Sequence, residues 1–158
     1  MKEIPLTQGK CALVDDEDYD FISQWKWWVH LNRHTSYAVR RVGGRSESKT
    51  IWMHRLILKS PDQLLVDHID GNGLNNQKSN LRFASQAQNL RNTGKRSAYK
   101  KYKGTSLKRD RWEARICFNN QKFYLGSFES EEEAAEAYDK AAMDFFGEFA
   151  YLNFPLTS

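Results

Sequence analysis

A strict two-residue alternation over residues 111–118 constrains the fold of this chain more than any other stretch. In "RWEARICF", every second residue is polar or small and the residues between are mostly apolar. Successive side chains of a strand point to opposite faces, so this pattern predicts a half-buried β-strand. "KFYLGSF" continues the alternation after Asn119-Asn120, a pair typical of tight turns. The stretch therefore predicts an antiparallel hairpin whose outward face carries Arg111, Glu113, Arg115, Cys117, Lys122 and Tyr124.

The segment after this hairpin has the marks of a complete helix. Ser130 followed by Glu133 has the spacing of a capping box, and Gly147 suits a helix end. An apolar stripe at helical spacing runs through Ala135, Tyr138, Ala142 and Phe145. We therefore expect residues 102–158 to form a domain with a small three-stranded antiparallel sheet. One face is covered by this acidic helix and the other face is basic and bare.

This segment resembles the plant ethylene-response-factor (APETALA-type) DNA-binding domain. The resemblance covers residues 102–155 and rests on "YKGTS", "WEARI", "FYLGSF", "EEEAAEAYDKAA" and "FGEFAYLNFP". It implies that the sheet enters the major groove of double-stranded DNA and contacts bases and phosphates. The implied contact residues are Lys103, Arg109, Arg111, Arg115, Lys122 and Tyr124. A shortened first turn and Cys117 depart from the plant pattern, so a different base preference is expected.

The stretch "VDHIDGNGLNNQKSNLRFASQAQN", residues 66–89, is poor core material but rich in catalytic residue types. It predicts a strand, a Gly- and Asn-rich turn, a returning strand and a helix that begins at Ser85. Hydrolysis of a phosphodiester needs a held base and a cation. Asp67 and Asn89 offer hard oxygen ligands that suit Mg²⁺. Asn80 is positioned to orient the ring of His68.

The same stretch resembles the HNH endonuclease motif, the ββα-metal nuclease fold, in the version found in phage and intron-encoded homing endonucleases. The resemblance covers about residues 53–92 and rests on "MHRLIL", "DHIDGN", "NN", "SNLR" and "QN". It implies His68 as general base, Asn80 as its orienter, and Asp67 and Asn89 as ligands of one divalent ion, Mg²⁺ or Mn²⁺. The third residue of the motif is Asn89 here, where the name HNH indicates a His. An amide ligand favours a hard metal.

Several neighbouring residues have plainer interpretations. The run from Asp70 to Gly73 lacks the further carboxylates of an EF-hand, so a calcium loop is not expected. Asn75 and Asn76 are expected to form the turn, and His54 to be a packed residue rather than a metal ligand. For Arg82 and Arg91, the alternatives are contact with DNA phosphate and exposure to solvent; we favour phosphate.

Residues 1–58 are rich in aromatic and β-branched residues and predict short strands in "QWKWWVHL", "SYAVRRV" and "KTIWMHRL". Gly43-Gly44 suggests a hairpin, and "DDEDYDFISQ" a short helix opened by Asp15 or Asp16. The Trp residues of "WKWW" suit core packing better than a stacking platform for bases. The expected class is α+β, with a β-rich nuclease domain at 1–92, a basic linker at 93–101 and the DNA-binding domain at 102–158. The linker is either a tether or a segment that follows DNA.

Charge is distributed unevenly along the chain. Residues 93–128 hold ten basic residues against two acidic ones, whereas residues 129–158 hold eight acidic residues against one basic residue. Such asymmetry predicts a basic face for a polyanion, backed by an acidic element. With no apolar run long enough to span a bilayer and no signal-peptide core, we expect a cytoplasmic, non-secreted protein of a bacterium or phage-infected cell, with no membrane partner. Two distant cysteines, Cys11 and Cys117, are expected to be buried free thiols.

These expectations combine into a site-specific, homing-type DNA endonuclease whose C-terminal sheet selects the target. No small-molecule cofactor is expected, and one catalytic set per chain suits a monomer or a weak homodimer. The main alternative is a sequence-specific DNA-binding regulator with an inactive nuclease module. A nonspecific or RNA-directed nuclease is the other. The complete set of Asp67, His68, Asn80 and Asn89 favours an active nuclease.

Overall fold

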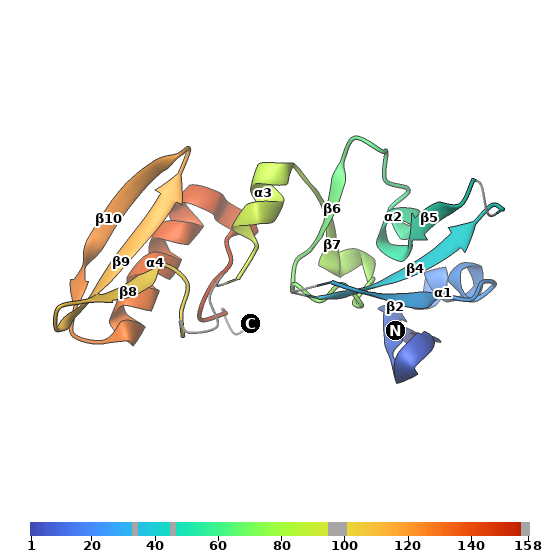
Figure 1. Cartoon of the computed structure of the whole chain (residues 1–158), viewed down its shortest axis with the longest axis horizontal. Coiled ribbons are helices and arrows are strands. Elements are labelled where there is room, and N and C mark those ends of the chain that lie inside the picture. Colours follow the sequence, from blue (N-terminus) through green and yellow to red (C-terminus); the bar gives the residue numbers. More distant parts are fainter. Residues whose placement is uncertain (33–34, 45–46, 95–100, 156–158) are drawn as a thin grey trace. The chain divides into compact units, whose positions relative to one another are not determined.

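The computed structural model describes residues 1–32, 35–44, 47–94 and 101–155 (Figure 1). The chain divides into two compact units, Met1–Gln86 and Ala87–Ser158. This division falls inside a short helix, somewhat before the domain end expected at residue 92. Most of the expected linker, residues 95–100, lies outside the described residues.

The first unit begins with a hairpin and a helix. Strands β1 (Lys2–Pro5) and β2 (Cys11–Val14) pair antiparallel across the 3-10 turn η1 (Thr7–Gly9). Helix α1 (Asp16–Ile22) follows, with Asp15 in the N-cap position and three acidic residues in its first turn. Acidic side chains there favour the positive end of the helix dipole. The predicted helix in this segment is confirmed.

A three-stranded antiparallel sheet in the order β3-β4-β5 forms the middle of this unit. Its strands are β3 (Trp28–Leu31), β4 (Ser36–Val42) and β5 (Lys49–Trp52). The predicted turn at Gly43 is confirmed, and its φ of +95° is a conformation that glycine adopts at little cost. The strand expected in "KTIWMHRL" is only half right, because it ends at Trp52 and helix α2 (Met53–Ile57) follows directly.

The segment with the candidate catalytic residues contains a hairpin followed by a helix. Strands β6 (Leu65–His68) and β7 (Leu81–Ala84) pair antiparallel, and the loop between them ends in the 3-10 turn η2 (Lys78–Asn80). Helix α3 (Gln86–Arg91) comes next. The predicted order of elements is therefore confirmed, whereas the packed ββα arrangement stays a proposal.

The core of the first unit joins most of its strands to helices α1 and α2. Buried apolar side chains come from β1, β2, α1, β4, α2 and β7 and from the residue before β3, among them Ile4, Val14, Ile22, Trp27, Met53 and Leu81. The loop with few apolar residues is thus supported by a core built mainly from the first 58 residues. Burial of this apolar surface is the main stabilising contribution.

The second unit is a three-stranded antiparallel sheet with one long helix. Strands β8 (Thr105–Lys108), β9 (Arg111–Phe118) and β10 (Gln121–Phe128) lie in the order β10-β9-β8. Asn119 and Asn120 form the turn, with φ values of +49° and +62°. Helix α4 (Glu131–Phe146) starts with the predicted Ser130–Glu133 capping box and ends at Gly147, and the 3-10 turn η3 (Gly147–Phe149) follows.

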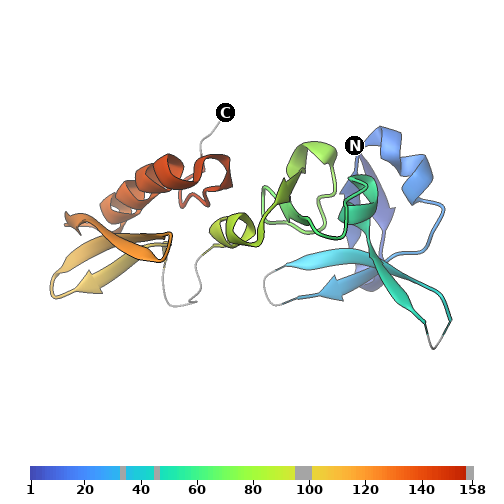
Figure 2. The same cartoon turned by 90° about the horizontal axis from the view of Figure 1, so that it is seen from above.

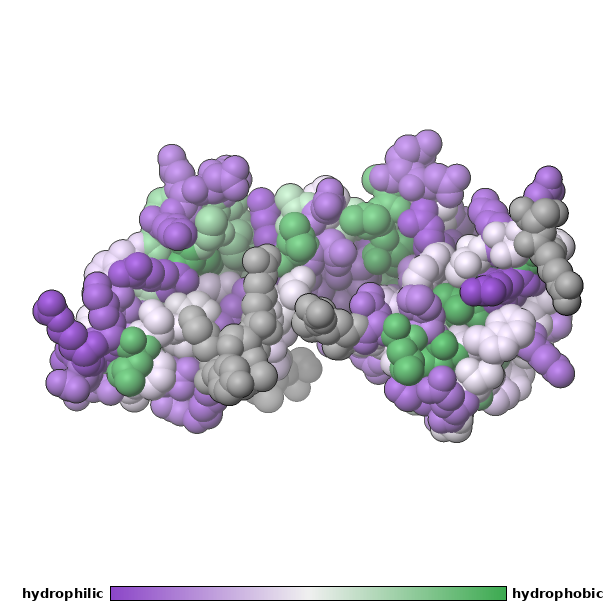
Figure 3. All heavy atoms as spheres, in the orientation of Figure 1, coloured by the Kyte–Doolittle hydropathy of each residue, from purple (hydrophilic) through white to green (hydrophobic). Residues whose placement is uncertain are grey.

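Helix α4 covers only one face of this sheet (Figure 2). Ile116, Tyr138 and Ala142 form the buried centre, and Phe123, Leu125 and Phe145 pack around it. The opposite face carries exposed Arg115 and Cys117, as the alternation predicts. Hydrophilic side chains are abundant over the strands of this unit in Figure 3. The predicted layer arrangement is confirmed.

The fold class is correct at the level of a mixed, sheet-rich protein with small antiparallel sheets. The thiols of Cys11 and Cys117 are both free, as expected, but the expectation that they are buried is wrong, because both are exposed. Cys11 is the first residue of β2 and Cys117 is the last but one of β9, and both positions face solvent. Among the described residues, no helix is both long and apolar enough to cross a membrane.

Candidate functional site

Asp67 and His68 are the last two residues of β6, and both side chains are buried. In the register of the hairpin, Asp67 lies opposite Arg82 and His68 lies opposite Leu81. Adjacent residues of a strand point to opposite faces, so the carboxylate of Asp67 and the imidazole of His68 have different surroundings.

Asp67 forms an ion pair with Arg82 across the hairpin. Nε and one terminal nitrogen of Arg82 both donate to Oδ2 of Asp67, at 2.9 and 2.8 Å. Both side chains are close to fully buried, at 6% and 10% exposure. The structure therefore places Arg82 as the partner of a buried carboxylate, and its contact with DNA phosphate stays a prediction. Removing either charge leaves the other buried and unpaired, which costs about 3–5 kcal/mol.

His68 lies in a cluster of aromatic rings. Its ring centroid is 5.0 Å from that of His54 on α2 and 5.8 Å from that of Tyr37 on β4. Burial lowers the pKa of His68, while the nearby side chain of Asn76 and the carboxylates of Asp70 and Asp67 act to raise it. The net direction is downward, so the imidazole is neutral at pH 7 and able to accept a proton.

Asn80 holds the loop of the hairpin rather than the ring of His68. Its Nδ2 donates to Oδ1 of Asp70 and to the carbonyl of Asn75, both at 2.9 Å. Its Oδ1 accepts the backbone N–H of Asp70 at 3.0 Å. These three bonds use both N–H donors of the Asn80 amide and one of the two acceptor positions of its oxygen. These bonds fix the loop that follows His68, and the expected orienting of His68 by Asn80 stays a prediction.

The loop also closes on itself through Asp70. Oδ1 of Asp70 accepts the N–H of Asn72 at 2.8 Å, and Oδ2 accepts Nδ2 of Asn75 at 2.8 Å. These bonds are Asx-type contacts that satisfy a turn without a cation. They agree with the expectation that this segment is turn chemistry rather than a calcium loop.

The N-terminal hairpin and β4 fix this loop in place. Leu13 exchanges backbone bonds with it, donating to Leu74 and accepting from Asn76, both at 2.8 Å. Oδ2 of Asp15 accepts the N–H of Lys78 at 2.8 Å. At Gly73 an added Cβ would lie 2.5 Å from the carbonyl oxygen of Ser36, so only glycine fits there. The first 58 residues therefore support the catalytic loop.

Asn89 lies on α3, in the second unit, and is half-buried. A carboxylate and an amide, as at Asp67 and Asn89, offer the hard oxygen atoms that Mg²⁺ and Mn²⁺ prefer. Within the described ranges, no three His, Cys, Asp or Glu side chains gather as a metal-binding group. Each of these donors by itself suits a hard cation that keeps several waters, although Arg82 already contacts Oδ2 of Asp67.

The bare face of the C-terminal sheet brings together most of the residues expected to contact DNA. Arg109, in an exposed turn, precedes exposed Arg111, while Arg115, Lys122 and Tyr124 are exposed on the paired strands β9 and β10. In the register, Tyr124 lies opposite Arg115 and Lys122 lies opposite Cys117. Arg115 also donates to Glu113 at 2.7 Å, and Arg111 donates to Ser127. Exposed pairs of this kind are weak and easily exchanged for phosphate.

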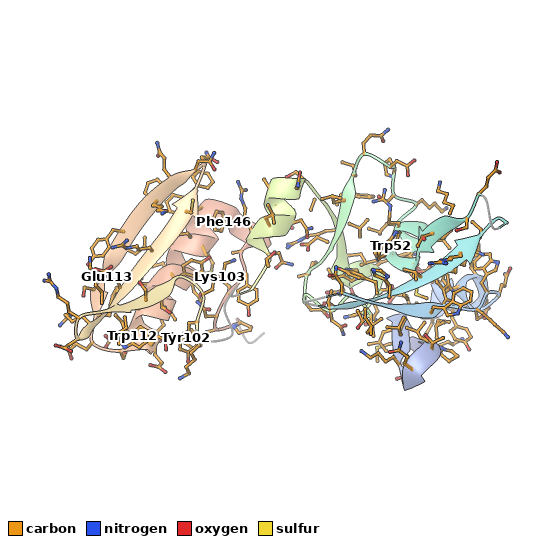
Figure 4. All side chains as sticks on the ribbon, viewed as in Figure 1. Trp52, Tyr102, Lys103, Trp112, Glu113 and Phe146 are labelled. Carbon is orange, nitrogen blue, oxygen red and sulfur yellow. The ribbon has the colours of Figure 1, made fainter. Side chains whose placement is uncertain are left out.

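Lys103 and Arg91 lie elsewhere in this unit. Nζ of Lys103 donates to the carbonyls of Arg91 and Thr93, at 2.8 and 2.6 Å (Figure 4). The guanidinium of Arg91 lies over the rings of Phe118 and Phe146, at 5.5 and 5.2 Å. Both cations therefore help to stabilise the unit, and their expected contacts with DNA stay predictions.

The Trp residues of "WKWW" divide between core and surface. Trp27 is buried, and its Nε1 donates to the carbonyl of Ile22 at 2.9 Å. The guanidinium of Arg40 lies 4.1 Å from the ring centroid of Trp25. Trp28 is 44% exposed and lines a groove of about 460 Å³ together with Val29, His30, Val39 and Arg41. Core packing therefore describes only part of this cluster.

Sequence reasoning missed three residues beside the candidate catalytic pair. Tyr37 contacts His68 from β4, the side chain of Asn76 acts to raise the pKa of His68 from the loop, and Arg82 pairs with Asp67. The hairpin register gives a signal for Arg82, because it lies directly opposite Asp67. The sequence has no comparable signal for Tyr37, whose contact depends on how the loop packs on β4.

Comparisons with known proteins give two kinds of relative. A family model described as HNH endonuclease matches residues 52–91. An uncharacterized HNH endonuclease from Acanthamoeba polyphaga mimivirus is 31% identical over 152 residues, which cover 92% of this chain and 76% of the relative. The ethylene-responsive transcription factor WRI1 and the AP2-like ethylene-responsive transcription factor ANT, both from Arabidopsis thaliana, are 44% identical over 62 residues and 53% identical over 49 residues. These matches span 37% and 30% of this chain, but only 14% and 9% of the plant proteins.

Proposed function

Because the chain belongs to the HNH endonuclease family, we propose that it is a metal-dependent, site-specific DNA endonuclease of the homing type. The observation that carries this proposal is the buried, neutral imidazole of His68 beside the buried carboxylate of Asp67. A base that works near neutral pH must be unprotonated there, and burial favours that state.

In the proposed reaction, Nδ1 or Nε2 of His68 accepts a proton from the attacking water. The water oxygen then bonds to phosphorus as the bond from phosphorus to the 3′ oxygen breaks in line with it. The departing 3′ oxygen takes a proton from solvent, which gives 5′-phosphate and 3′-hydroxyl ends. Asp67 and Asn89 are the residues that would hold Mg²⁺ or Mn²⁺, and Asn80 keeps the loop around His68 in shape. When bound, the cation would neutralise negative charge on the phosphate.

The second unit is proposed to select the DNA site. Arg111, Arg115, Lys122 and Tyr124 form one exposed face, and Arg109 stands at its end. Arginine forks suit guanine edges in the major groove, and lysine suits phosphate. The likeness of part of the chain to plant transcription factors supports double-stranded DNA as the partner.

A DNA-binding regulator with an inactive nuclease module is the alternative function. One observation favours it: Arg82 occupies Oδ2 of Asp67 with two hydrogen bonds. The two functions are separated by incubating the purified full chain and Mg²⁺ with supercoiled plasmids that carry a random-sequence insert. New nicked or linear DNA with defined 5′ ends supports the endonuclease, whereas binding without any new ends supports the regulator.

Loss of two arginines from the bare face should weaken DNA binding. For the double variant Arg111→Ala, Arg115→Ala we expect at least about a tenfold loss of affinity for duplex DNA. The slope of log affinity against log salt concentration should fall by about two units at most, one for each lost phosphate contact. Titration by fluorescence anisotropy at several salt concentrations measures both quantities. Lys140→Ala is the matched control, because this exposed cation lies on the helix α4; equal losses in both proteins would place the DNA elsewhere.

The two exposed cysteines provide an independent test of the same face. Cys117 lies beside Arg115 on β9 and opposite Lys122, whereas Cys11 lies on β2 in the other unit. Bound DNA should slow the alkylation of Cys117 by a neutral maleimide several-fold and leave the rate at Cys11 unchanged. Mass spectrometry of peptides after timed labelling gives both rates from one sample. Unchanged labelling of Cys117 at saturating DNA would contradict the proposed face.

A further inference from the structure

Helix α2 places a second imidazole against the candidate catalytic one. His54 is the second residue of this helix, and it is 7% exposed. Its neighbours Met53 and Ile57 are anchored in the core of the first unit. Arg55, the next residue, donates to the carbonyls of Pro61 and Leu64, at 2.7 and 2.9 Å. The helix is therefore fixed at both of its sides, and His54 has a defined position.

The ring of His54 contacts His68 edge to face. Their centroids are 5.0 Å apart and their planes are inclined by 82°. Tyr37 contacts both rings, at 5.7 Å from His54 and 5.8 Å from His68. Trp52, labelled in Figure 4, packs against Tyr37 and His54 at 5.5 and 5.8 Å. Four rings from β4, β5, α2 and β6 thus form one closed cluster, in which an edge-to-face contact favours a single inclination of the His68 plane.

Within the described part of the chain, Nδ1 of His54 is buried and has no hydrogen-bond partner. The ring is therefore held by its aromatic contacts rather than by a hydrogen bond at that nitrogen. Burial, with a smaller effect of the facing His68, lowers the pKa of His54 to about 3. His54 is consequently neutral over the whole working range and places no positive charge beside a ring that must accept a proton.

We propose that His54 is a positioning residue for the endonuclease reaction, which holds the plane of the His68 imidazole by edge-to-face contact. The proposal rests on the proposed function, because it assigns His68 the role of base. The side chain of Asn76 lies near the same ring and acts to raise its pKa, but its Oδ1 accepts no hydrogen bond from the described residues. The contacts with His54 and Tyr37 therefore limit the rotation of the His68 ring. A base aimed at water loses rate when its orientation is averaged.

The test compares His54→Ala, His54→Phe and Met53→Ala in the full chain. His54→Ala should lower kcat for plasmid cleavage about 10- to 100-fold, with KM unchanged, because only the orientation of the base is lost. His54→Phe keeps an aromatic ring and should recover kcat to within a few-fold of the parent chain. Met53→Ala creates a neighbouring core defect and serves as the stability control. A His54→Phe protein as slow as His54→Ala would overturn the proposal, and so would a His54→Ala loss no larger than that of Met53→Ala.

A second readout does not depend on cleavage. Long-range ¹H–¹⁵N spectra of the imidazoles should show one sharp pattern for His68 in the parent chain and in His54→Phe, and an averaged or broadened pattern in His54→Ala. An unchanged His68 pattern in His54→Ala would overturn the positioning role even if the proteins cut DNA. If the parent chain does not cut DNA but the His68 pattern changes as expected, the ring contact stands and the proposed function fails.

Discussion

His68→Ala is expected to reduce plasmid cleavage by at least about 100-fold, the smaller end of what a positioned general base contributes. The affinity for duplex DNA should stay within about twofold of the parent value, since the proposed DNA face lies on β9 and β10 of the other unit. Cleavage is measured as the initial rate of nicking in Mg²⁺, and affinity is measured in chelator on the same preparation.

His30→Ala is the control for removing an imidazole from the same unit. His30 is exposed on β3, and its ring contacts that of Trp52 at a centroid distance of 5.3 Å. We expect it to keep most of the cleavage rate. Equal rates for His68→Ala and the parent chain would remove the base from the proposed reaction. A loss of DNA affinity as large as the loss of cleavage would instead mean that His68 is structural.

The pH dependence of the parent chain provides a further check on the same residue. Burial lowers the pKa of His68 below its ordinary value of 6.5, so the neutral form persists to more acidic pH than in a free histidine. Cleavage should therefore be constant through neutral pH and fall only below about pH 6.5. A fall that begins well above that value would contradict a neutral, buried base.

The local pattern of the sequence was sufficient to predict the second unit. Alternation at Trp112, Ala114 and Ile116 and the capping box at Ser130 are short-range signals, and each fixes a face or an end of one element. The hairpin around Asp67 was predictable for the same reason, because turn residues and flanking strands are adjacent in the chain. These features depend on periods of two and 3.6 residues, which can be read without knowing the tertiary structure.

The surroundings of the candidate catalytic residues were not predictable in this way. The sequence did not reveal that the amide of Asn80 bonds to Asp70 and Asn75, which lie in the same loop. It also did not reveal that the ammonium group of Lys103 bonds to carbonyls at the end of α3 and just after it. Such contacts join residues that are neither periodic nor adjacent, and side-chain type alone does not choose between phosphate and carbonyl as the partner of a cation.

Removal of divalent metal is expected to stop cleavage completely while DNA affinity is retained. The donors at Asp67 and Asn89 are a carboxylate and an amide, which bind Mg²⁺ and Mn²⁺ better than softer metals. Excess EDTA should abolish nicking, and Mg²⁺ or Mn²⁺ added beyond the chelator should restore it. Full activity in EDTA would refute the role assigned to this pair.

Two variants separate metal binding by Asp67 from its ion pair with Arg82. Asp67→Asn and Arg82→Gln both break the pair, and each should destabilise the first unit by a few kcal/mol, about the cost of leaving one buried charge unpaired. Only Asp67→Asn removes a charged ligand, so only this variant should raise the Mg²⁺ concentration needed for half-maximal cleavage. Asp62→Asn is the control, because it alters a carboxylate that is 90% exposed. It should change neither the stability nor the Mg²⁺ requirement. Thermal melting gives the stability of each protein, and a Mg²⁺ titration of the nicking rate gives its metal requirement. If Arg82→Gln raised the Mg²⁺ requirement as much as Asp67→Asn, the carboxylate would be acting through the shape of the hairpin, and its assignment as a metal ligand would fail.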